Sequence, residues 1–136
     1  MGVSIRLLSL PSELLACQDL IRRIWSMPDL EIPPLHVLVA VQRNGGLVLG
    51  AFDGPELVGY VFGFPGRTKD GGVKHCSHML GVDPEYQNER VGTRLKLAQR
   101  EAVLAQGDEL ITWTYEPLAS RNAYLNLHKL GAVCRT

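Results

Sequence analysis

The chain has few cysteines, no excess of charge of either sign and no long hydrophobic run. Cys17, Cys76 and Cys134 form no C-x-x-C pair, so neither a disulfide framework nor a structural zinc site is expected, and the reducing cytoplasm fits best. Fourteen basic residues balance fourteen acidic ones, which gives no electrostatic case for nucleic acid or an anionic membrane as a partner. No apolar stretch reaches the roughly 18 residues of a membrane span.

What is present indicates one domain over residues 1–136, without repeats or linkers. Apolar runs of strand character alternate with amphipathic stretches of helical period. Strands are expected over residues 3–9, 47–52, 57–64, 73–82, 110–115 and 132–135, and helices over 11–25, 34–43, 93–105 and 120–130. A hairpin turn at 53–56 and a strand–helix–strand crossover over 73–115 predict a mixed, mostly antiparallel sheet flanked by helices, an α+β fold.

The most informative stretch is Leu80–Arg94, where a strand ends at Asp83-Pro84 and a short polar loop with Gly92 opens into a helix. Such a turn gathers unpaired backbone N–H groups at the positive end of a helix dipole, which favours phosphate. The expected donors are consecutive: Gln87, Asn88, Glu89, Arg90, Val91 and Gly92. The alternative is that Gly92 only helps the chain turn into the helix. Neither a P-loop nor a G-x-G-x-x-G motif is present, so a nucleoside triphosphate or NAD is disfavoured.

These residues resemble the GNAT superfamily of N-acetyltransferases, whose loop reads Gln/Arg-x-x-Gly-x-Gly/Ala after a strand ending in Val-x-Pro. Val82-Asp83-Pro84 matches the lead-in, and Gln87 and Gly92 match the first and last loop positions, while Arg90 stands where the middle glycine is usual. Lys129-Leu130-Gly131 resembles the end of the family's later helix. Ser120-Arg121-Asn122-Ala123 resembles the Asn-x-x-Ala that opens that helix, with Ser120 in the usual Asn place.

The resemblance implies acetyl-CoA as co-substrate. Its pyrophosphate would lie on residues 87–93, with Asn122 as a further contact, and its pantetheine would run along Leu80, Gly81 and Val82 like an added strand, which requires an open sheet edge. Gly81 leaves that approach unobstructed or marks a bulge. The family's sheet closes with a hairpin, which here is expected to be cut short at Thr136, so dimerisation or strand exchange through residues 132–136 is predicted.

His78 is the leading candidate for the base that deprotonates the amine. Strand alternation predicts that residues 76, 78, 80 and 82 share one face, which would place His78 beside the pantetheine. Arylalkylamine members of the family carry a histidine at this place, and an imidazole with an ordinary pKa of about 6.5 suits proton removal near neutral pH. The alternative is a strand histidine without a catalytic role.

The family's usual acid is a tyrosine four residues before the glycine of the last helix, where this chain has Leu127. Tyr124, three residues earlier, is the substitute candidate, and a packed core tyrosine is the alternative. Trp113 is expected either in the substrate pocket or in the core. No metal site is expected from His75, Cys76 and His78, because strand residues three apart face opposite ways. The charges of 94–100 are interpreted as a solvated helix face.

Together these features predict an N-acetyltransferase that transfers acetyl from acetyl-CoA by direct attack of an amine. The acceptor is expected to be a small-molecule amine or an exposed amino group of a protein, not nucleic acid or membrane. An acyl-CoA-binding regulatory module without catalysis is the alternative, suggested by Leu127 and Arg90.

Overall fold

The computed structural model describes residues 2–114, 122–126 and 132–135. Strands and helices follow one another along the chain with two short 3-10 helices between them. In chain order the elements are β1 (Ser4–Leu7), α1 (Pro11–Trp25), η1 (Asp29–Glu31), α2 (Leu35–Arg43), β2 (Leu47–Asp53), β3 (Glu56–Arg67), β4 (Val73–Val82), η2 (Pro84–Glu89), α3 (Val91–Ala105), β5 (Leu110–Thr114), β6 (Asn122–Asn126) and β7 (Ala132–Arg135).

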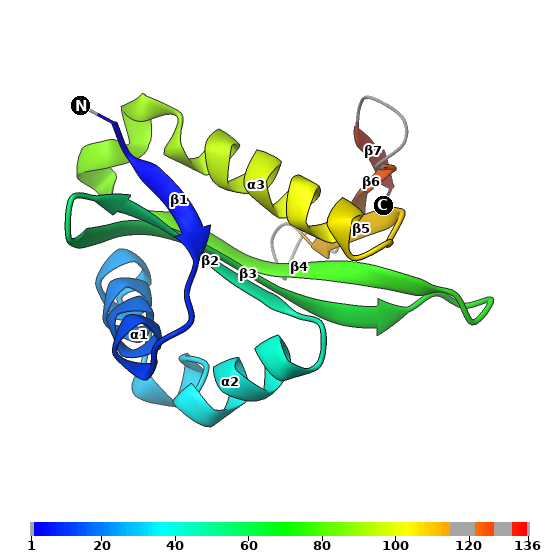
Figure 1. Ribbon diagram of the computed structural model, residues 1–136, viewed down its shortest axis with the longest axis horizontal. Helices are drawn as coiled ribbons and strands as arrows, with labels where there is room; N and C mark the ends of the chain where they lie inside the picture. The colour runs from blue at the N-terminus through cyan, green and yellow to red at the C-terminus, as the bar shows by residue number, and fades with distance from the viewer. Residues whose placement is uncertain (1, 115–121, 127–131, 136) are drawn as a thin grey trace.

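The described strands form one sheet in the order β1-β2-β3-β4-β5-β6-β7. Neighbouring strands are antiparallel except β4 and β5, which are parallel because α3 connects them as a crossover. Helices α1 and α2 cover one face of the sheet, and α3 covers the other (Figure 1). The predicted mixed, mostly antiparallel sheet flanked by helices is therefore confirmed.

Two large hydrophobic clusters and a smaller third one hold the layers together, and β2 and β3 are buried on both faces. Leu14, Ile21 and Leu38 of α1 and α2 pack against Tyr60 and Phe62 on one side. On the opposite face, Val91 and Leu95 of α3 pack against the sheet through a second cluster that includes Val58, Val61 and Val82. The β2–β3 pair is thus enclosed between the two helical layers. None of the helices in the described part of the chain is long and apolar enough to cross a membrane.

The predicted helix over 120–130 is wrong for residues 122–126, which form strand β6. These residues pair antiparallel with β5, with Asn122 opposite Thr114 and Asn126 opposite Leu110. The outer edge of β5 carries unpaired N–H and C=O groups, and pairing with this short segment satisfies them, so tertiary context overrides local helix propensity. β7 then pairs with β6 at the edge of the sheet, and dimerisation through that strand stays a prediction.

The start of α1 is fixed by a carboxylate. Glu13 Oε1 accepts hydrogen bonds from the backbone N–H groups of Ser9 at 2.9 Å and Leu10 at 3.2 Å, and Oε2 pairs with Arg6 at 2.6 Å. The Arg6 guanidinium and the two N–H groups lower the pKa of Glu13 to about 2. The carboxylate therefore links β1 to the first turn of the helix.

Glu13→Ala is expected to lower the free energy of unfolding at pH 7 by about 1 kcal/mol, as loss of a helix N-terminal cap does. Because the folded pKa lies below the ordinary value of 4.5, this stabilisation is present above pH 4.5 and is lost as the pH falls toward about 2. Denaturant melts from pH 7 to pH 2 check this, with the exposed acid Glu31→Ala as control. A constant difference between wild type and Glu13→Ala across that range would contradict the assignment.

Candidate active site

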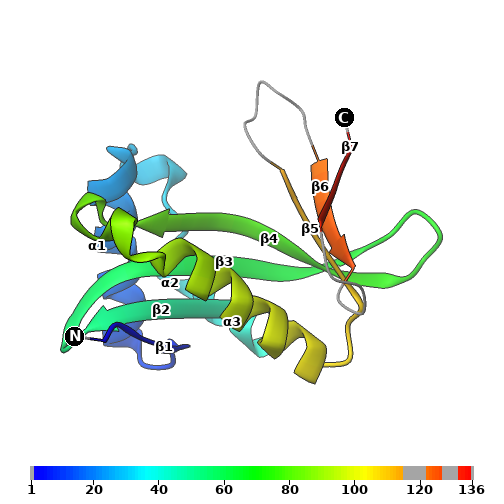
Figure 2. The same ribbon diagram turned by 90° about the horizontal axis from the view of Figure 1, so that it is seen from above.

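Strands β4 and β5 separate soon after they meet. Their pairing extends only from His75 opposite Ile111 to Ser77 opposite Trp113, whereas the pairing of β4 with β3 continues to Val82. Figure 2 shows β5 leaving β4 at this point. Residues 79–82 of β4 are therefore paired with β3 on one side, and none of the described residues pairs with them on the other. Within the described part of the chain, this stretch is an open sheet edge of the kind that the pantetheine of the resemblance requires.

A β-bulge at His78 reverses the faces of β4. Phe62 pairs with Met79 and Gly63 with Ser77, so His78 is the extra residue of the bulge. The expectation that residues 76, 78, 80 and 82 share a face is consequently wrong. His78 lies on the α1/α2 face, where its ring packs against Phe62 and Phe64 with centroids 5.7 and 5.6 Å apart. Leu80 belongs to the α3 face.

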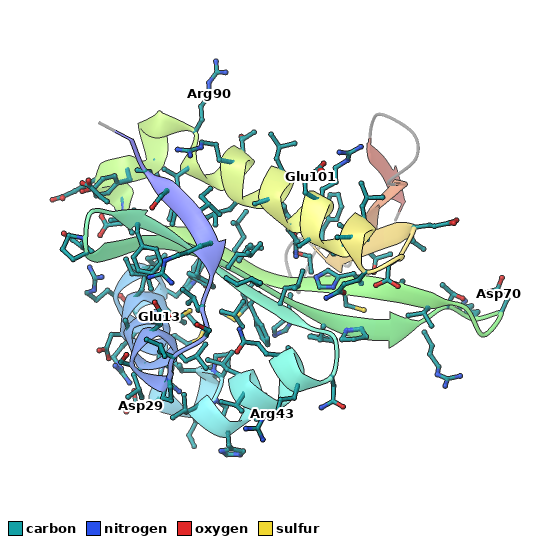
Figure 3. All side chains as sticks on the ribbon, in the orientation of Figure 1. Glu13, Asp29, Arg43, Asp70, Arg90 and Glu101 are labelled. Carbon is teal, nitrogen blue, oxygen red and sulfur yellow. The ribbon has the colours of Figure 1, made fainter. Side chains whose placement is uncertain are left out.

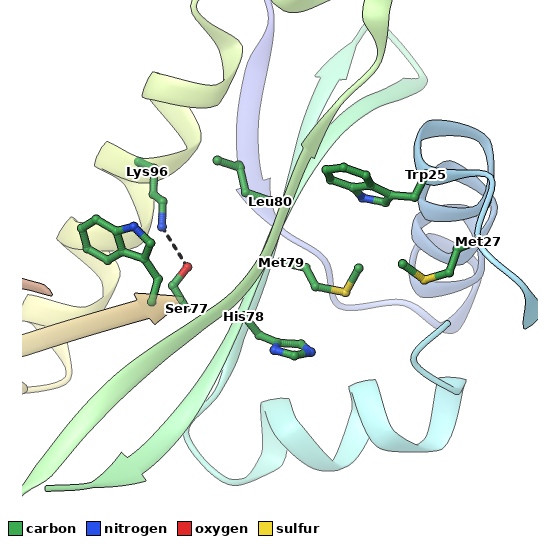
Figure 4. A pocket seen from close by; sticks show the side chains of 8 residues that line it. Trp25, Met27, Ser77, His78, Met79, Leu80 and Lys96 are labelled. Carbon is green, nitrogen blue, oxygen red and sulfur yellow. Dashed lines mark hydrogen bonds between the residues drawn. The ribbon is translucent and has the colours of Figure 1, made fainter. Parts of the chain in front are cut away.

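A cavity of about 630 Å³ opens where the two strands part, and we call it the acetyl pocket after the acetyl group of the expected co-substrate. Its lining comes from both faces of the sheet, with His78 and Met79 toward α1 and α2, and Ser77, Leu80 and Lys96 toward α3 (Figure 4). The remaining lining residues are Trp25, Met27 and Trp113. Burial lowers the pKa of His78, which keeps the imidazole neutral and able to accept a proton near pH 7.

Polar side chains meet under the α3 side of this pocket. The Lys96 ammonium donates to Ser77 Oγ at 2.9 Å and to Gln99 Oε1 at 3.4 Å, and it lies 4.7 Å from the centre of the Trp113 ring. Gln99 Nε2 lies 3.1 Å from both Ser77 Oγ and His75 Nε2. Burial lowers the pKa of Lys96 to about 8, and burial and then the charge of Lys96 lower that of His75 to about 4.

A second cavity of about 430 Å³, here called the loop pocket, adjoins the first and shares Trp25 and Leu80 with it. Trp25 is held there because its indole Nε1 donates to the Tyr60 hydroxyl at 2.7 Å. The other lining residues of the loop pocket are Ile24, Gly81, Val82, Pro84, Gln87, Arg90, Gly92 and Thr93. The two cavities thus follow the open edge of β4 from the start of α3 to the bulge.

The unpaired N–H groups of the loop before α3 lie further along the chain than the sequence suggested. Residues 87–89 belong to η2, a 3-10 helix whose amides bond to carbonyls three residues earlier. The first α-helical bond runs from the Arg94 N–H to the Arg90 carbonyl at 3.0 Å, so the amides of residues 91–93 have no partner within the helix. Arg90 adopts a left-handed conformation with φ of 58°, which explains why glycine suits this position.

The structure brings together most of the predicted cofactor contacts. Leu80, Gly81, Val82, Gln87, Arg90, Gly92 and Thr93 all line the loop pocket. Val91 is buried in the α3 core and reaches the site only through its backbone, and Asn88 and Glu89 belong to η2. The bulge lies at His78 and not at Gly81, where a Cβ would approach the Tyr60 ring to 2.7 Å. Gly81 is therefore needed for packing.

Two predicted site residues lie on β6. The backbone of Tyr124 pairs with Thr112 and that of Asn122 with Thr114. Their side chains and the whole of Leu127 lie outside the described residues, so the roles of Tyr124 and Asn122 stay predictions. Trp113, left open between pocket and core, does both: it lines the acetyl pocket and packs against a small core cluster.

Sequence reasoning missed Lys96 and its partners Ser77 and Gln99. The interpretation of 94–100 as a solvated face is wrong for Lys96, which is half-buried, and for Gln99, which is 1% exposed. Their spacing of three residues, alongside the buried Leu95 and Val103, is the sequence signal that places polar groups on the inner face of α3.

Comparisons with known proteins agree with this architecture. The chain is similar to an aminoglycoside acetyltransferase from an uncultured soil metagenomic sample, with 18% identity, coverage of 85% of this chain and 79% of that one, and a TM-score of 0.73. It is also similar to two proteins solved with coenzyme A. The PaiA N-acetyltransferase of Thermoplasma acidophilum has 21% identity, with coverage of 86% of this chain and 81% of that one and a TM-score of 0.67. The N-acetyltransferase YhbS of Escherichia coli has 19% identity, with coverage of 85% of this chain and 64% of that one and a TM-score of 0.67.

Because all three sequence identities are low, these structural similarities establish only the fold. A search of curated proteins found no match. The family itself is established by sequence, because the profile of the acetyltransferase (GNAT) family matches residues 14–132, nearly the whole chain. The resemblance seen in the loop at 87–92 and its lead-in is thereby confirmed. This chain belongs to the GNAT family of acetyltransferases.

Proposed function

We propose that the protein is an acetyl-CoA-dependent N-acetyltransferase that acts by direct attack of an amine on the bound thioester. The observation that carries this proposal is the pair of adjoining cavities along the edge of β4 that no other described residue pairs with. One end offers the free amides of residues 91–93, and the other holds His78 and Lys96. An elongated ligand with a phosphate group at one end and a reactive group at the other fits these two adjoining pockets.

The residues along the two pockets suit each part of acetyl-CoA. The amides at the start of α3 suit the pyrophosphate, which prefers backbone donors at a helix N-terminus. A Cβ added at Gly92 would touch only Val82 Cγ2, at 3.7 Å, so this stretch of the loop is open. The free backbone of residues 80–82 suits the amides of pantetheine, which would pair with it as a strand does. Acetyl-CoA supplies an activated acyl group.

The acceptor side of the acetyl pocket favours an amine with an apolar body. Trp25, Met27 and Met79 form its wall, and no carboxylate from the described residues lines the cavity. The soil metagenomic neighbour is an aminoglycoside acetyltransferase, also solved with sisomicin. A polycation of that kind would require acidic partners, because each buried ammonium needs a counter-charge. We therefore expect a primary amine with a single positive charge, or an exposed amino group flanked by apolar residues.

His78 is proposed as the base. Its imidazole is neutral and lies on the α1/α2 side of the acetyl pocket, from which the amine is expected to approach. It can there take the proton that the amine must lose, directly or through a water molecule.

Two measurements test the proposed function. CoA release with phenylethylamine, an aminoglycoside and an apolar peptide N-terminus is expected to exceed the background rate, with the aminoglycoside as the poorest acceptor. Acetyl-CoA at about 100 times its Kd is expected to stabilise the fold by about 2.7 kcal/mol. Stabilisation without turnover on any amine would favour the acyl-CoA-binding module, and absence of stabilisation at millimolar acetyl-CoA would refute the proposal.

Arg90→Ala is expected to weaken acetyl-CoA binding roughly 3- to 5-fold at low salt, since an exposed charged contact contributes up to about 1 kcal/mol. The Arg90 side chain projects outward from the start of α3 beside the loop pocket (Figure 3). Arg90→Gly should lose the same affinity yet raise the melting temperature, because glycine adopts the left-handed conformation without strain.

Calorimetric titration at low and high ionic strength and thermal melts check both Arg90 variants. The difference in affinity should shrink at high salt because counterions screen exposed charges. The exposed Arg67→Ala, on the β3–β4 hairpin, serves as the control. Equal affinities of wild type and Arg90→Ala at low salt would contradict a phosphate contact.

A further inference from the structure

Lys96 is the cation that the fold holds at the junction of β4 and β5. It projects from the second turn of α3 into the acetyl pocket and donates to Ser77, the last β4 residue paired with β5 (Figure 4). The Trp113 ring lies against the ammonium from the β5 side. The side chain is therefore held on three sides, by β4, by β5 and by its own helix through Gln99. Its remaining side faces the pocket.

The charge of Lys96 is not neutralised by its described surroundings. Its hydrogen-bond partners, Ser77 and Gln99, are uncharged, and no carboxylate of the described residues pairs with it. Two histidines of β4 belong to its surroundings: His75 shares the Gln99 contact, and His78 lines the same pocket. A half-buried ammonium with neutral partners favours an anion in the space in front of it.

The path of the ligand through the two pockets indicates which anion forms in front of Lys96. If the ligand runs from the amides of α3 along residues 80–82, its reactive end reaches the pocket on the α3 face, the face of Leu80 and Lys96. The amine comes from the opposite face, where His78 lies. Among the described residues, the two ionisable side chains that line the acetyl pocket are thus separated, with Lys96 on the thioester side and His78 on the amine side.

We propose that Lys96 is the catalytic acid that protonates the departing sulfur of coenzyme A, an inference that rests on the proposed function. The amine nitrogen bonds to the acetyl carbon, the carbon–sulfur bond breaks, and the sulfur takes the electron pair and then the proton of Lys96. The proton that the amine loses to His78 or to water balances this transfer. Acetyl-CoA and amine thus give amide and free thiol, and solvent returns each side chain to its starting protonation state.

The acidity of Lys96 suits this step. A thiol has an ordinary pKa of about 8.5, and proton transfer is efficient when donor and acceptor are matched. The pKa of Lys96 is lowered to about 8 by burial, so the group is mostly protonated at pH 7 yet a much stronger acid than an exposed lysine. Tyr124, the sequence-based candidate, is the rival donor.

The first test measures the ionisation of bound coenzyme A and needs no turnover. The charge of Lys96 stabilises a thiolate beside it, so the thiol of bound CoA should titrate at lower pH in wild type than in Lys96→Met. CoA affinity should accordingly rise with pH in wild type up to about pH 8, above which Lys96 itself loses its proton, and it should rise less in the variant, while desulfo-CoA shows no such difference. The exposed Lys69→Met should behave as wild type. Identical titrations of bound CoA in wild type and Lys96→Met would overturn the proposal.

The second test is kinetic. Lys96→Met is expected to lower kcat about 100-fold with little change in the Kd of desulfo-CoA, since loss of a positioned acid typically costs at least this factor. Wild-type kcat should fall as the pH rises through about 8, where Lys96 loses its proton, and this limb should be absent in Lys96→Met. Lys96→Arg, which keeps the charge and the fold but is a much weaker acid, should retain the lowered thiol titration and lose kcat.

The outcomes separate this inference from the function on which it rests. A wild type that binds acetyl-CoA and acetylates amines, with Lys96→Met within 3-fold of it and Tyr124→Phe inactive, would leave the function standing and assign the acid to Tyr124. A stable acetyl group found on Lys96 by intact mass after incubation with acetyl-CoA alone would make Lys96 an acceptor and overturn the proposal. A wild type without affinity for CoA would refute the proposed function, and this inference with it.

Discussion

Replacement of His78 by glutamine is expected to lower kcat by about 10²- to 10⁴-fold, the usual contribution of a positioned general base. Glutamine has nearly the reach of the imidazole and can hydrogen-bond an amine, but it cannot take a proton at neutral pH. The Kd of acetyl-CoA should change little, because the lining of the loop pocket does not include His78. Steady-state kinetics with an apolar amine, together with a binding titration, measure both quantities.

The pH dependence gives this prediction a second readout. Because burial lowers the pKa of His78 below its ordinary value of 6.5, the wild-type kcat/KM should rise with pH through a limb that lies below 6.5. In His78→Gln that limb should be absent.

His36→Gln is the matched control, since this histidine is exposed on α2 and does not line either pocket. If His78→Gln lowered kcat less than 3-fold and kept the acidic limb, His78 would be the strand histidine without a catalytic role.

Gly63→Ala is expected to destabilise the fold by about 1–3 kcal/mol, because the added methyl group has no space. A Cβ at Gly63 would lie 2.2 Å from Nε2 of the fully buried His75 and 2.8 Å from the backbone oxygen of Cys76. The imidazole is held by Gln99, and moving the Cys76 carbonyl would disturb the β3–β4 ladder next to the bulge. Each kcal/mol should lower the melting temperature by several degrees in a domain of this size.

The same substitution should also disturb the site. His75 and Lys96 both contact Gln99, so displacement of the His75 imidazole should shift the pH at which kcat falls on the alkaline side of the pH profile. Gly92→Ala is the control for the fold: its Cβ would meet only Val82 Cγ2, at an ordinary 3.7 Å, and stability should be unchanged or rise by up to about 1 kcal/mol. Equal melting temperatures for Gly63→Ala and wild type would show that the β3–β4 pair yields more easily than its burial indicates.

Local patterns were sufficient where elements are long or bounded by strong signals. The α1 helix begins at Pro11 as predicted, the 53–56 turn joins β2 to β3, and β4 spans the predicted residues 73–82. Residues 122–126 were misassigned because a five-residue segment carries little periodicity and its pairing with β5 decides its state. Most of the loop pocket was predictable because eight of its lining residues are nearly contiguous in the chain, from Leu80 to Thr93, whereas Ile24 and Trp25 of α1 reach it only through the fold.

The sequence by itself therefore determined the family, the layered fold and the loop before α3, because these depend on short-range patterns. Only the tertiary structure decided which way His78 faces, since one extra residue in β4 reverses strand alternation and the partner strand fixes where that residue falls. Only the tertiary structure placed Lys96 in the pocket, because its position depends on how α3 packs over the gap between β4 and β5, residues far apart along the chain.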